Sequence, residues 1–467
     1  MTYYVDKQYD FTYNGIINKS VKEKTMRISL SDHFDCKKML CFTLPSIIMM
    51  VFTSIYGVVD GFFVSNFVGK TAFAAVNFIM PFLMLLGPIG FMFGTGGSAL
   101  IAKTLGEGDS KKANKLFSMF VYITVAVSII ITVISLFILR PVAQALGAEG
   151  QMLEDCVLYG RIIIITLPFL MLQFEFQSFF ITAEKPKLGL YSTIASGVTN
   201  MVLDFLFMAI FNLGVAGAAT ATALSQVVGG IIPIIYFTRP NTSLLKLGAF
   251  EFDGRSLFKA CTNGSSELMS NISMSLVGIL YNIQLLKYAG ENGVAAYGVL
   301  MYLNFIFISV FIGFTVGIAP VIGFHYGAKN FGELQGLRKK STVIIMLASA
   351  VMLVLGETLA YPLSFIFVGY DAELTRITLR GFSIYSFSFL FAGMAIFGSA
   401  FFTALNDGLT SALISFFRTL VFQVAAVMIL PHFFDIDGIW ISVVAAEVMA
   451  VVITVFFMVV KKKKYNY

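Results

Sequence analysis

Twelve long apolar stretches, separated by short polar segments, follow one another from residue 42 to residue 460. Each is long enough for the ~20 residues that a helix needs to cross a bilayer. The predicted spans are residues 42–65, 73–101, 116–139, 157–180, 188–212, 215–237, 262–287, 294–322, 342–366, 381–404, 410–434 and 437–460. The pattern therefore predicts an all-α integral membrane protein with twelve transmembrane helices.

Composition excludes a soluble protein. Only 12% of the residues are charged and 58% are hydrophobic, whereas soluble domains carry about 25% charged residues. The mean hydropathy is +0.85, and a bilayer accepts such apolar side chains along most of each helix. The four cysteines lack CxxC or metal-ligand spacing, so we expect neither a disulfide framework nor a zinc site.

Basic residues lie mainly on one side of the predicted spans. If both termini are cytoplasmic, 26 of the 32 Lys and Arg residues fall on the inner side, Arg418 included, and 6 fall outside. Because basic residues near helix ends stay in the cytoplasm, this count predicts cytoplasmic termini and an even number of spans. We interpret the basic runs as topology anchors and expect no nucleic-acid partner.

A single offset of 221 residues relates the two halves of the sequence. It pairs Gly69 with Gly290, Gly106 with Gly327, Gly160 with Gly381, Thr182-Ala183 with Thr403-Ala404, and Gly217 with Gly438. Chance similarity between apolar helices would not keep one register over five segments, so we predict a duplicated unit of six helices. Six spans per unit make the repeat parallel, which is typical of carriers with a substrate site between two bundles near the bilayer midplane.

The repeat predicts the organisation of the whole chain. The predicted parts are a cytoplasmic N-terminal tail (1–41), an N-lobe (42–237), a basic cytoplasmic connector (238–261), a C-lobe (262–460) and a basic cytoplasmic C-terminus (461–467). Glycines in the second and eighth spans predict close helix packing or bends. These glycines are Gly94, Gly96, Gly97, Gly313 and Gly317.

Three acidic residues, Asp60, Glu175 and Asp204, lie deep in the predicted spans of the first half. An acid in mid-membrane costs at least about 2.5 kcal/mol and is by default a functional candidate that faces a cavity. Asn200 precedes Asp204 by four residues, so both lie on one helical face, where they can hold a proton, a sodium ion or a cationic ligand. The structural alternative is that each carboxylate only hydrogen-bonds neighbouring helices.

The second half has none of these acids at the equivalent positions. The offset carries Asp60, Glu175 and Asp204 to Tyr281, Ile396 and Ala425. Glu267 lies near the inner end of the seventh span, where it binds an ion or substrate or else reaches water. Glu447 in the twelfth span has no obvious partner in the sequence. We therefore predict a symmetric scaffold with asymmetric chemistry.

Several segments resemble one family of transporters. They are VDGFFV in the first span, GEGDSKKAN after the second, NMVLD followed by LGVAGAATATALSQ in the fifth and sixth, and PVIGFHYGAKN at the end of the eighth. Together they resemble the multidrug and toxic compound extrusion (MATE) transporters, and among them the bacterial exporters of the staphylococcal MepA type. The resemblance covers about residues 35–460.

The resemblance implies a V-shaped pair of six-helix lobes that alternates between inward and outward openings and exchanges H⁺ or Na⁺ for a lipophilic, often cationic compound. Asp60 matches the family's aspartate in the first helix, and Asn200 with Asp204 match its pair in the fifth helix, all linked to ion coupling and substrate release. Some members carry a deeper glutamate in the seventh helix and an acid in the tenth. Here Asn271 stands at the first place and no acid at the second, which favours a scheme confined to the N-lobe.

These observations predict an antiporter in the bacterial inner membrane, monomeric and surrounded by lipid, with no cofactor other than its coupling ion. Drug and ion compete for the N-lobe carboxylates, and a possible transient sodium site lies at Asn200 and Asp204. The alternatives are a lipid-linked precursor or polysaccharide flippase, a channel and a membrane enzyme. A flippase would need a cationic groove, and an enzyme would need a motif such as HExxH or GxSxG, which the chain lacks.

Overall fold

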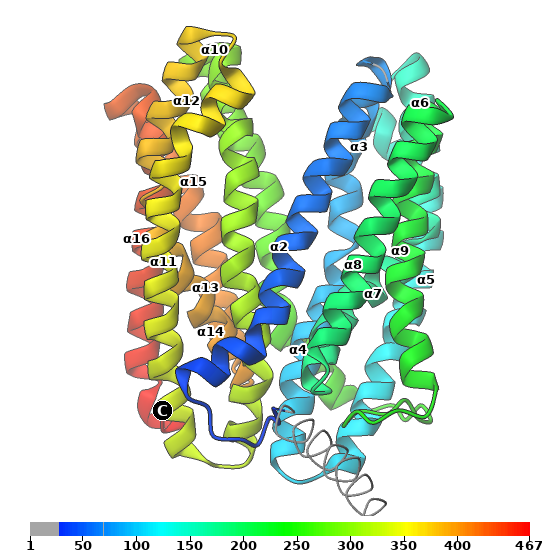
Figure 1. Ribbon diagram of the computed structural model, residues 1–467, viewed down its shortest axis with the longest axis vertical. Coiled ribbons are helices and arrows are strands. Elements are labelled where there is room, and N and C mark those ends of the chain that lie inside the picture. Colours follow the sequence, from blue (N-terminus) through cyan, green and yellow to red (C-terminus); the bar gives the residue numbers. More distant parts are fainter. Residues whose placement is uncertain (1–27, 69) are drawn as a thin grey trace, which may run out of the picture.

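Two helical bundles, the N-lobe and the C-lobe, lie side by side in the computed structural model (Figure 1). The structure describes residues 28–68 and 70–467, and these contain helices and no strand. Residues 1–27 of the predicted tail, and Gly69 of the repeat, lie outside the described residues. The predicted all-α fold is confirmed.

The helices of each lobe follow one another along the chain and pack side by side (Figure 1). Those of the N-lobe are α2 (Cys36–Phe67), α3 (Lys70–Leu86), α4 (Pro88–Gly106), α5 (Ser110–Leu146), α6 (Gly150–Ile165), α7 (Leu167–Thr182), α8 (Pro186–Asp204), the π-helix η1 (Phe205–Ile210) and α9 (Gly214–Thr238). Those of the C-lobe are α10 (Gly254–Gly327), α11 (Phe331–Val368), α12 (Ala372–Tyr385), α13 (Ser388–Ala404), α14 (Gly408–Phe416), the π-helix η2 (Phe417–Val421), α15 (Phe422–Ile429), α16 (Pro431–Val460) and the short α17 (Lys462–Tyr465).

The described residues form twelve spans. Nine helical segments are long and apolar enough to cross a membrane, and two bent pairs add two more spans. The 74-residue α10 is broken at Gly290, whose φ of 61° and ψ of −153° are non-helical, so it contributes two spans. The predicted number of spans is confirmed.

The backbone shows the same internal repeat as the sequence. Left-handed φ angles occur at Gly108 (86°) and at Lys329 (55°), and 329 − 108 is 221. They also occur at Gly214 (58°) and Asp435 (49°), and 435 − 214 is again 221. The fourth span of each lobe is bent, by 52° between α6 and α7 and by 48° between α12 and α13. The duplication therefore extends to turns and kinks.

Several helices begin earlier than the apolar pattern predicts. The helix that contains the ninth span starts at Phe331, ahead of the apolar run predicted from 342, because Asn330 caps α11 by accepting a hydrogen bond from the Glu333 N–H. The seventh starts at Gly254 instead of 262, where the Asp253 side chain caps α10. A capping side chain can start a helix whose first turn is polar. A prediction from hydrophobicity alone therefore places these helix starts too late.

One end of the molecule, lower in Figure 1, carries the basic loops and the C-terminus, and we call it the basic end. Glycines let the two lobes touch there. A Cβ on Gly106 would lie 2.0 Å from the Phe324 carbonyl oxygen, and one on Gly327 would lie 2.1 Å from that of Lys103. These contacts are related by the repeat.

The predicted close-packing glycines Gly96, Gly313 and Gly317 also contact the other lobe, whereas Gly94 and Gly97 pack within the N-lobe.

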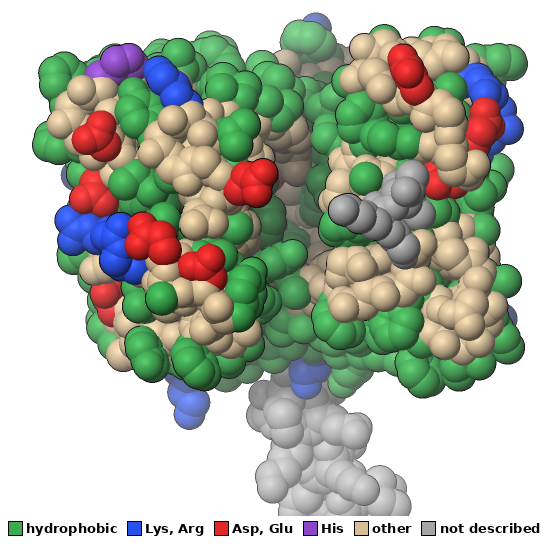
Figure 2. Space-filling view, turned by 90° about the horizontal axis from the view of Figure 1, so that it is seen from above, with side chains coloured by type: hydrophobic (Ala, Val, Ile, Leu, Met, Phe, Trp, Pro, Cys, Tyr) green, Lys and Arg blue, Asp and Glu red, His purple; other side chains and the backbone are tan. Residues whose placement is uncertain are grey.

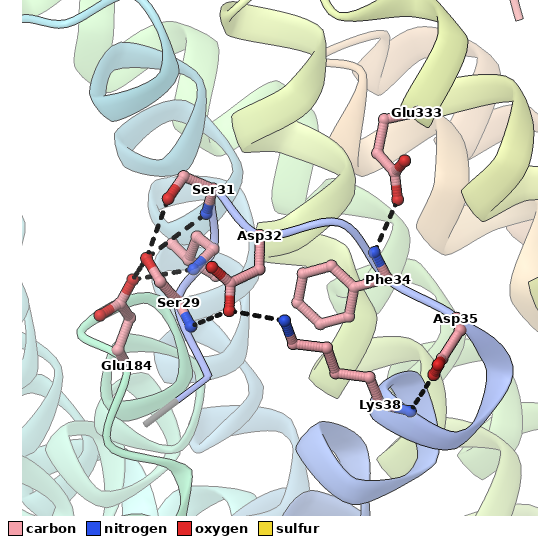
Figure 3. A network of polar contacts seen from close by, with 9 residues as sticks. Ser29, Ser31, Asp32, Phe34, Asp35, Lys38, Glu184 and Glu333 are labelled. Carbon is pink, nitrogen blue, oxygen red and sulfur yellow. Dashed lines mark hydrogen bonds and ion pairs between the residues drawn. The ribbon is translucent and has the colours of Figure 1, made fainter. Parts of the chain in front are cut away.

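Residues 28–35, which we call the strap, cross the basic end and join the lobes (Figure 3). On the N-lobe side, Glu184 Oε1 accepts hydrogen bonds from the Leu30 N–H at 2.8 Å and from Ser29 Oγ at 2.6 Å. On the C-lobe side, Glu333 Oε1 accepts one from the Phe34 N–H at 2.9 Å, and its Oε2 lies 2.6 Å from His33 Nδ1.

Apolar anchors hold the strap in place. Leu30 and Phe34 are fully buried in a cluster that includes Phe314 and Leu337. Burying such a side chain contributes about 1.5–3 kcal/mol, and Lys340 Nζ donates a further hydrogen bond to the Phe34 carbonyl oxygen. The lobes are therefore closed against each other at the basic end.

The opposite end is open between the lobes. Figure 2, which views the molecule from that end, shows a hollow between two groups of side chains. The outer faces of the helices carry large exposed apolar residues, such as Phe137 and Ile366. Contiguous apolar surface of this extent is typical of contact with lipid.

The strap generates a prediction about pH. Partial burial alone would raise the pKa of the Glu333 carboxyl, but the hydrogen bonds from the Phe34 amide and His33, and the charges of His33 and Lys340, outweigh it and lower that pKa below 4.5. A lowered pKa stabilises the folded state above pH 4.5, and this contribution is lost as the pH falls through the lowered value.

We therefore expect Glu333→Gln to lower the free energy of unfolding at pH 7 by about 1 kcal/mol, with a smaller difference at more acid pH. Thermal unfolding of both purified proteins across pH measures it. Glu291→Gln, at an exposed acid, is the control and should leave the curve unchanged. A difference between Glu333→Gln and the parent that stays constant down to acid pH would contradict the prediction.

Candidate functional site

Helix α8 approaches α2 closely at Gly197. A Cβ at this position would lie 2.5 Å from the Phe52 ring and 2.8 Å from the Tyr56 ring, so the contact requires a residue without a side chain. Asn200 and Asp204 follow three and seven residues later, on the same face of α8. The close approach therefore holds both residues against α2.

Three of the predicted site residues meet at this contact. The side chains of Asn200 and Asp204 lie against the carboxylate of Asp60, which α2 supplies. Thr222 Oγ1 of α9 donates a hydrogen bond of 3.4 Å to Asp60 Oδ1. Tyr159 of α6 lies beside both carboxylates and beside Thr222. We call these five residues the acid cluster.

The acid cluster is mostly buried, and its carboxylates have no basic partner among the described residues. Asp204 is 0% exposed and Asn200 is 2% exposed, and the Asp204 oxygens and the Asn200 amide nitrogen have no hydrogen-bond partner that meets normal geometry. Asp60 keeps part of its surface exposed. No Lys or Arg of the described residues pairs with either carboxylate. Two adjacent carboxylates in a low dielectric repel one another, so the arrangement favours binding of a proton or a cation.

Backbone geometry changes directly after Asp204. The α-helix α8 ends there and continues as the π-helix η1. Turns of this kind are rare and are frequent at functional sites. The sequence carries no recognisable signal for it, because Phe205–Ile210 is an ordinary apolar run.

Glu175 lies elsewhere in the N-lobe. Its backbone packs against Gly94 of α4, where an added Cβ would lie 2.9 Å from the Glu175 Cα. Its carboxylate points toward Thr124 of α5, is 0% exposed and has no partner within normal hydrogen-bond geometry. The structure thus places Glu175 apart from the acid cluster.

The C-lobe contains an ion pair that the sequence prediction missed. Arg418, predicted to lie at the inner membrane surface, is instead inside the bundle on η2, where its Nε lies 2.9 Å and 3.1 Å from the Glu447 carboxylate oxygens. Glu447 therefore has a partner. The predicted site residue Glu267 lies within the electrostatic field of Arg418. The structure therefore places Glu267 near this ion pair and not in the acid cluster.

The histidines do not form a metal site. His33 lies in the strap, His325 is buried beside the strap backbone, and His432 lies on α16 at the open end. In the part of the chain that the structure describes, no three His, Cys, Asp or Glu side chains are grouped to hold a metal ion. A transient sodium site at Asn200 and Asp204 remains a prediction.

Comparison with known proteins identifies the family. A family model named MatE matches residues 45–206 and 268–429, which together exceed half of the chain. The chain belongs to the MatE family. One match falls in each lobe, as the repeat requires, and the first contains Asp60, Asn200 and Asp204. The resemblance to MATE transporters inferred from the sequence is confirmed.

The curated relatives of this MatE protein include staphylococcal exporters. The Multidrug export protein MepA of Staphylococcus saprophyticus is 25% identical over 418 residues, covering 88% of this chain and 90% of its own length. The protein of the same name from Staphylococcus haemolyticus is 25% identical over 436 residues, covering 90% and 92%. The chain is thus similar to MepA over most of both lengths.

Solved structures share the fold. A MATE protein crystallised in complex with MaL6 gives a TM-score of 0.88 at 22% identity, covering 93% of this chain and 98% of its own. An outward-facing multidrug resistance MATE transporter of the MOP superfamily gives 0.87 at 22% identity, covering 93% and 97%. The twelve-helix, two-repeat MATE fold is therefore shown.

The close approach at Gly197 predicts the effect of a side chain there. We expect Gly197→Val to push α8 away from α2, because the Phe52 and Tyr56 rings leave no room, and to cost about 1–3 kcal/mol. Thermal unfolding measures the loss. Gly278→Val is the matched control, since a Cβ at Gly278 meets nothing within 4 Å. Equal stability of the two variants would show that the contact does not need glycine.

Proposed function

We propose that this MATE protein is a secondary active antiporter that exports lipophilic, cationic compounds in exchange for H⁺ or Na⁺ by alternating access. It is a carrier and neither an enzyme nor a channel. The observation that carries the proposal is the acid cluster, in which two adjacent carboxylates, Asp60 and Asp204, lack a basic partner. A cation or a proton has to neutralise such a pair, and exchanging one for the other is an antiport reaction.

The exposure of the cluster supports exchange with a chamber. Asp60 is partly exposed, whereas Asp204 beside it is fully buried. A bulky cation is therefore expected to reach Asp60 first, while a proton or sodium ion fits between the carboxylates and the Asn200 amide. Binding of one neutralises the charge that attracts the other, so substrate and coupling ion compete.

The closed and open ends support alternating access. We place the basic end in the cytoplasm, because basic residues near helix ends are retained there. The structure then opens outward, as one of its structural neighbours is described to do. To open inward, the lobes have to separate along the Gly106 and Gly327 contacts and release the strap from Glu184 or Glu333.

The substrate class follows from the charge of the site and from the relatives. Carboxylates attract cations, and the chain offers 49 Phe and 22 Met residues for its cavity walls. Aromatic faces and methionine accommodate cations of different shapes. The similar staphylococcal proteins are named multidrug exporters. A flippase for lipid diphosphates is less supported, because the interior Arg418 is already paired with Glu447.

Replacing Asp204 tests the proposal. We expect Asp204→Asn to reduce gradient-driven efflux of a lipophilic cationic dye from vesicles at least tenfold, because the coupling ion then loses one of the two carboxylates between which it binds. Parallel vesicles with a proton gradient alone and a sodium gradient alone identify the coupling ion. Glu291→Gln, which also removes one acid, controls for net charge, and the amount of protein in the membrane is measured for each. Full efflux by Asp204→Asn would refute the assignment.

A further inference from the structure

The ion pair between Arg418 and Glu447 lies deep inside the C-lobe. Their side chains are 15% and 7% exposed, and both Glu447 oxygens accept from Arg418 Nε, at 3.1 Å and 2.9 Å. Arg418 stands ten residues beyond the start of α14, and Glu447 stands near the middle of α16. A charge at such a depth is costly unless it is paired.

A second acid, Glu267 on α10, lies within the electrostatic field of the guanidinium but beyond ion-pair distance. Tyr385 lies within the fields of both Arg418 and Glu447. Tyr281 lies near Glu447 and donates a 2.7 Å hydrogen bond to Gln423 Oε1. The C-lobe therefore has its own polar group, and the Arg418 side chain supplies its positive charge.

The repeat relates part of this polar group to the N-lobe site. Subtracting 221 carries Tyr281 to Asp60, Arg418 to Gly197 and Glu447 to Gln226. Asp60 is part of the acid cluster and Gly197 places α8 against α2, whereas Gln226 accepts a hydrogen bond from Thr166. Where the N-lobe has acids without a basic partner, the C-lobe has an acid with one.

We infer that Arg418 is a tethered counter-ion, which does permanently in the C-lobe what the coupling ion does reversibly in the N-lobe. Its guanidinium neutralises Glu447, so this pair binds no coupling ion and exchange takes place at the acid cluster. Arg418 thereby determines how many ions are coupled to each substrate. This inference rests on the proposed function.

Removing the tethered charge should create a second cation site. The experiment uses the full chain, purified in nanodiscs, and follows Trp440, the only tryptophan, which is buried on α16 two turns before Glu447. Its fluorescence is titrated with sodium at constant ionic strength, and separately with acid. In an Asp60→Asn, Asp204→Asn background, adding Arg418→Gln should yield one saturable cation site per chain that the background lacks. Adding Glu447→Gln to this triple variant should abolish the new cation site.

Two further variants separate this role from a structural one. Arg418→Lys keeps a tethered charge and should gain no site, whereas a pair that depends on the planar guanidinium would fail with Lys as with Gln. If Arg418→Gln does not fold, transport by the Arg418→Lys variant is measured instead. Its dye accumulation at a given ion gradient should equal that of the parent chain. A folded Arg418→Gln variant without a new site, or altered accumulation with Arg418→Lys, would overturn the inference.

Failure of the proposed function gives a different result. In that case the parent chain with Asp60 and Asp204 intact binds no cation, and the pair of asparagine substitutions changes nothing. The C-lobe titrations do not depend on that outcome, because they are made without the N-lobe carboxylates.

Discussion

An unpaired charge is costly inside a helix bundle surrounded by lipid, and the two lobes meet this constraint differently. In the C-lobe, Glu447 is paired with Arg418 of the same lobe. In the N-lobe, Asp60 and Asp204 lie together with an amide, a hydroxyl and a phenol, and with no basic side chain among the described residues. One lobe carries its counter-ion, while we propose that the other obtains it from solution.

In the proposed antiport, the rest of the fold serves to present that N-lobe site to one end at a time. The glycine contacts at Gly106 and Gly327, and the strap between Glu184 and Glu333, hold the lobes together at the basic end. The glycine contacts are backbone to backbone, so the lobes meet there as rigid surfaces that either touch or separate. Alternation between two openings is the motion that such surfaces permit.

Much of this could be predicted from the sequence because membrane helices obey strong rules. Twelve spans followed from apolar runs, and the offset of 221 residues predicted a duplication that the angles at Gly214 and Asp435 confirm. The acids Asp60 and Asp204 stood out because acids are rare in spans. Arg418 was assigned wrongly to the membrane surface. The sequence around a single arginine in an apolar run is the same whether that arginine lies at the surface or in the core of the bundle. Only the packing of α16 against η2 distinguishes the two.

The central claim is that the acid cluster exchanges one bound ion for one substrate. Its most direct test measures the protons or sodium ions that purified protein releases when a lipophilic cation binds, with an indicator dye in weak buffer or with labelled sodium. The account predicts release of about one ion for each substrate bound, at constant ionic strength. Substrate binding with release of neither ion would contradict it.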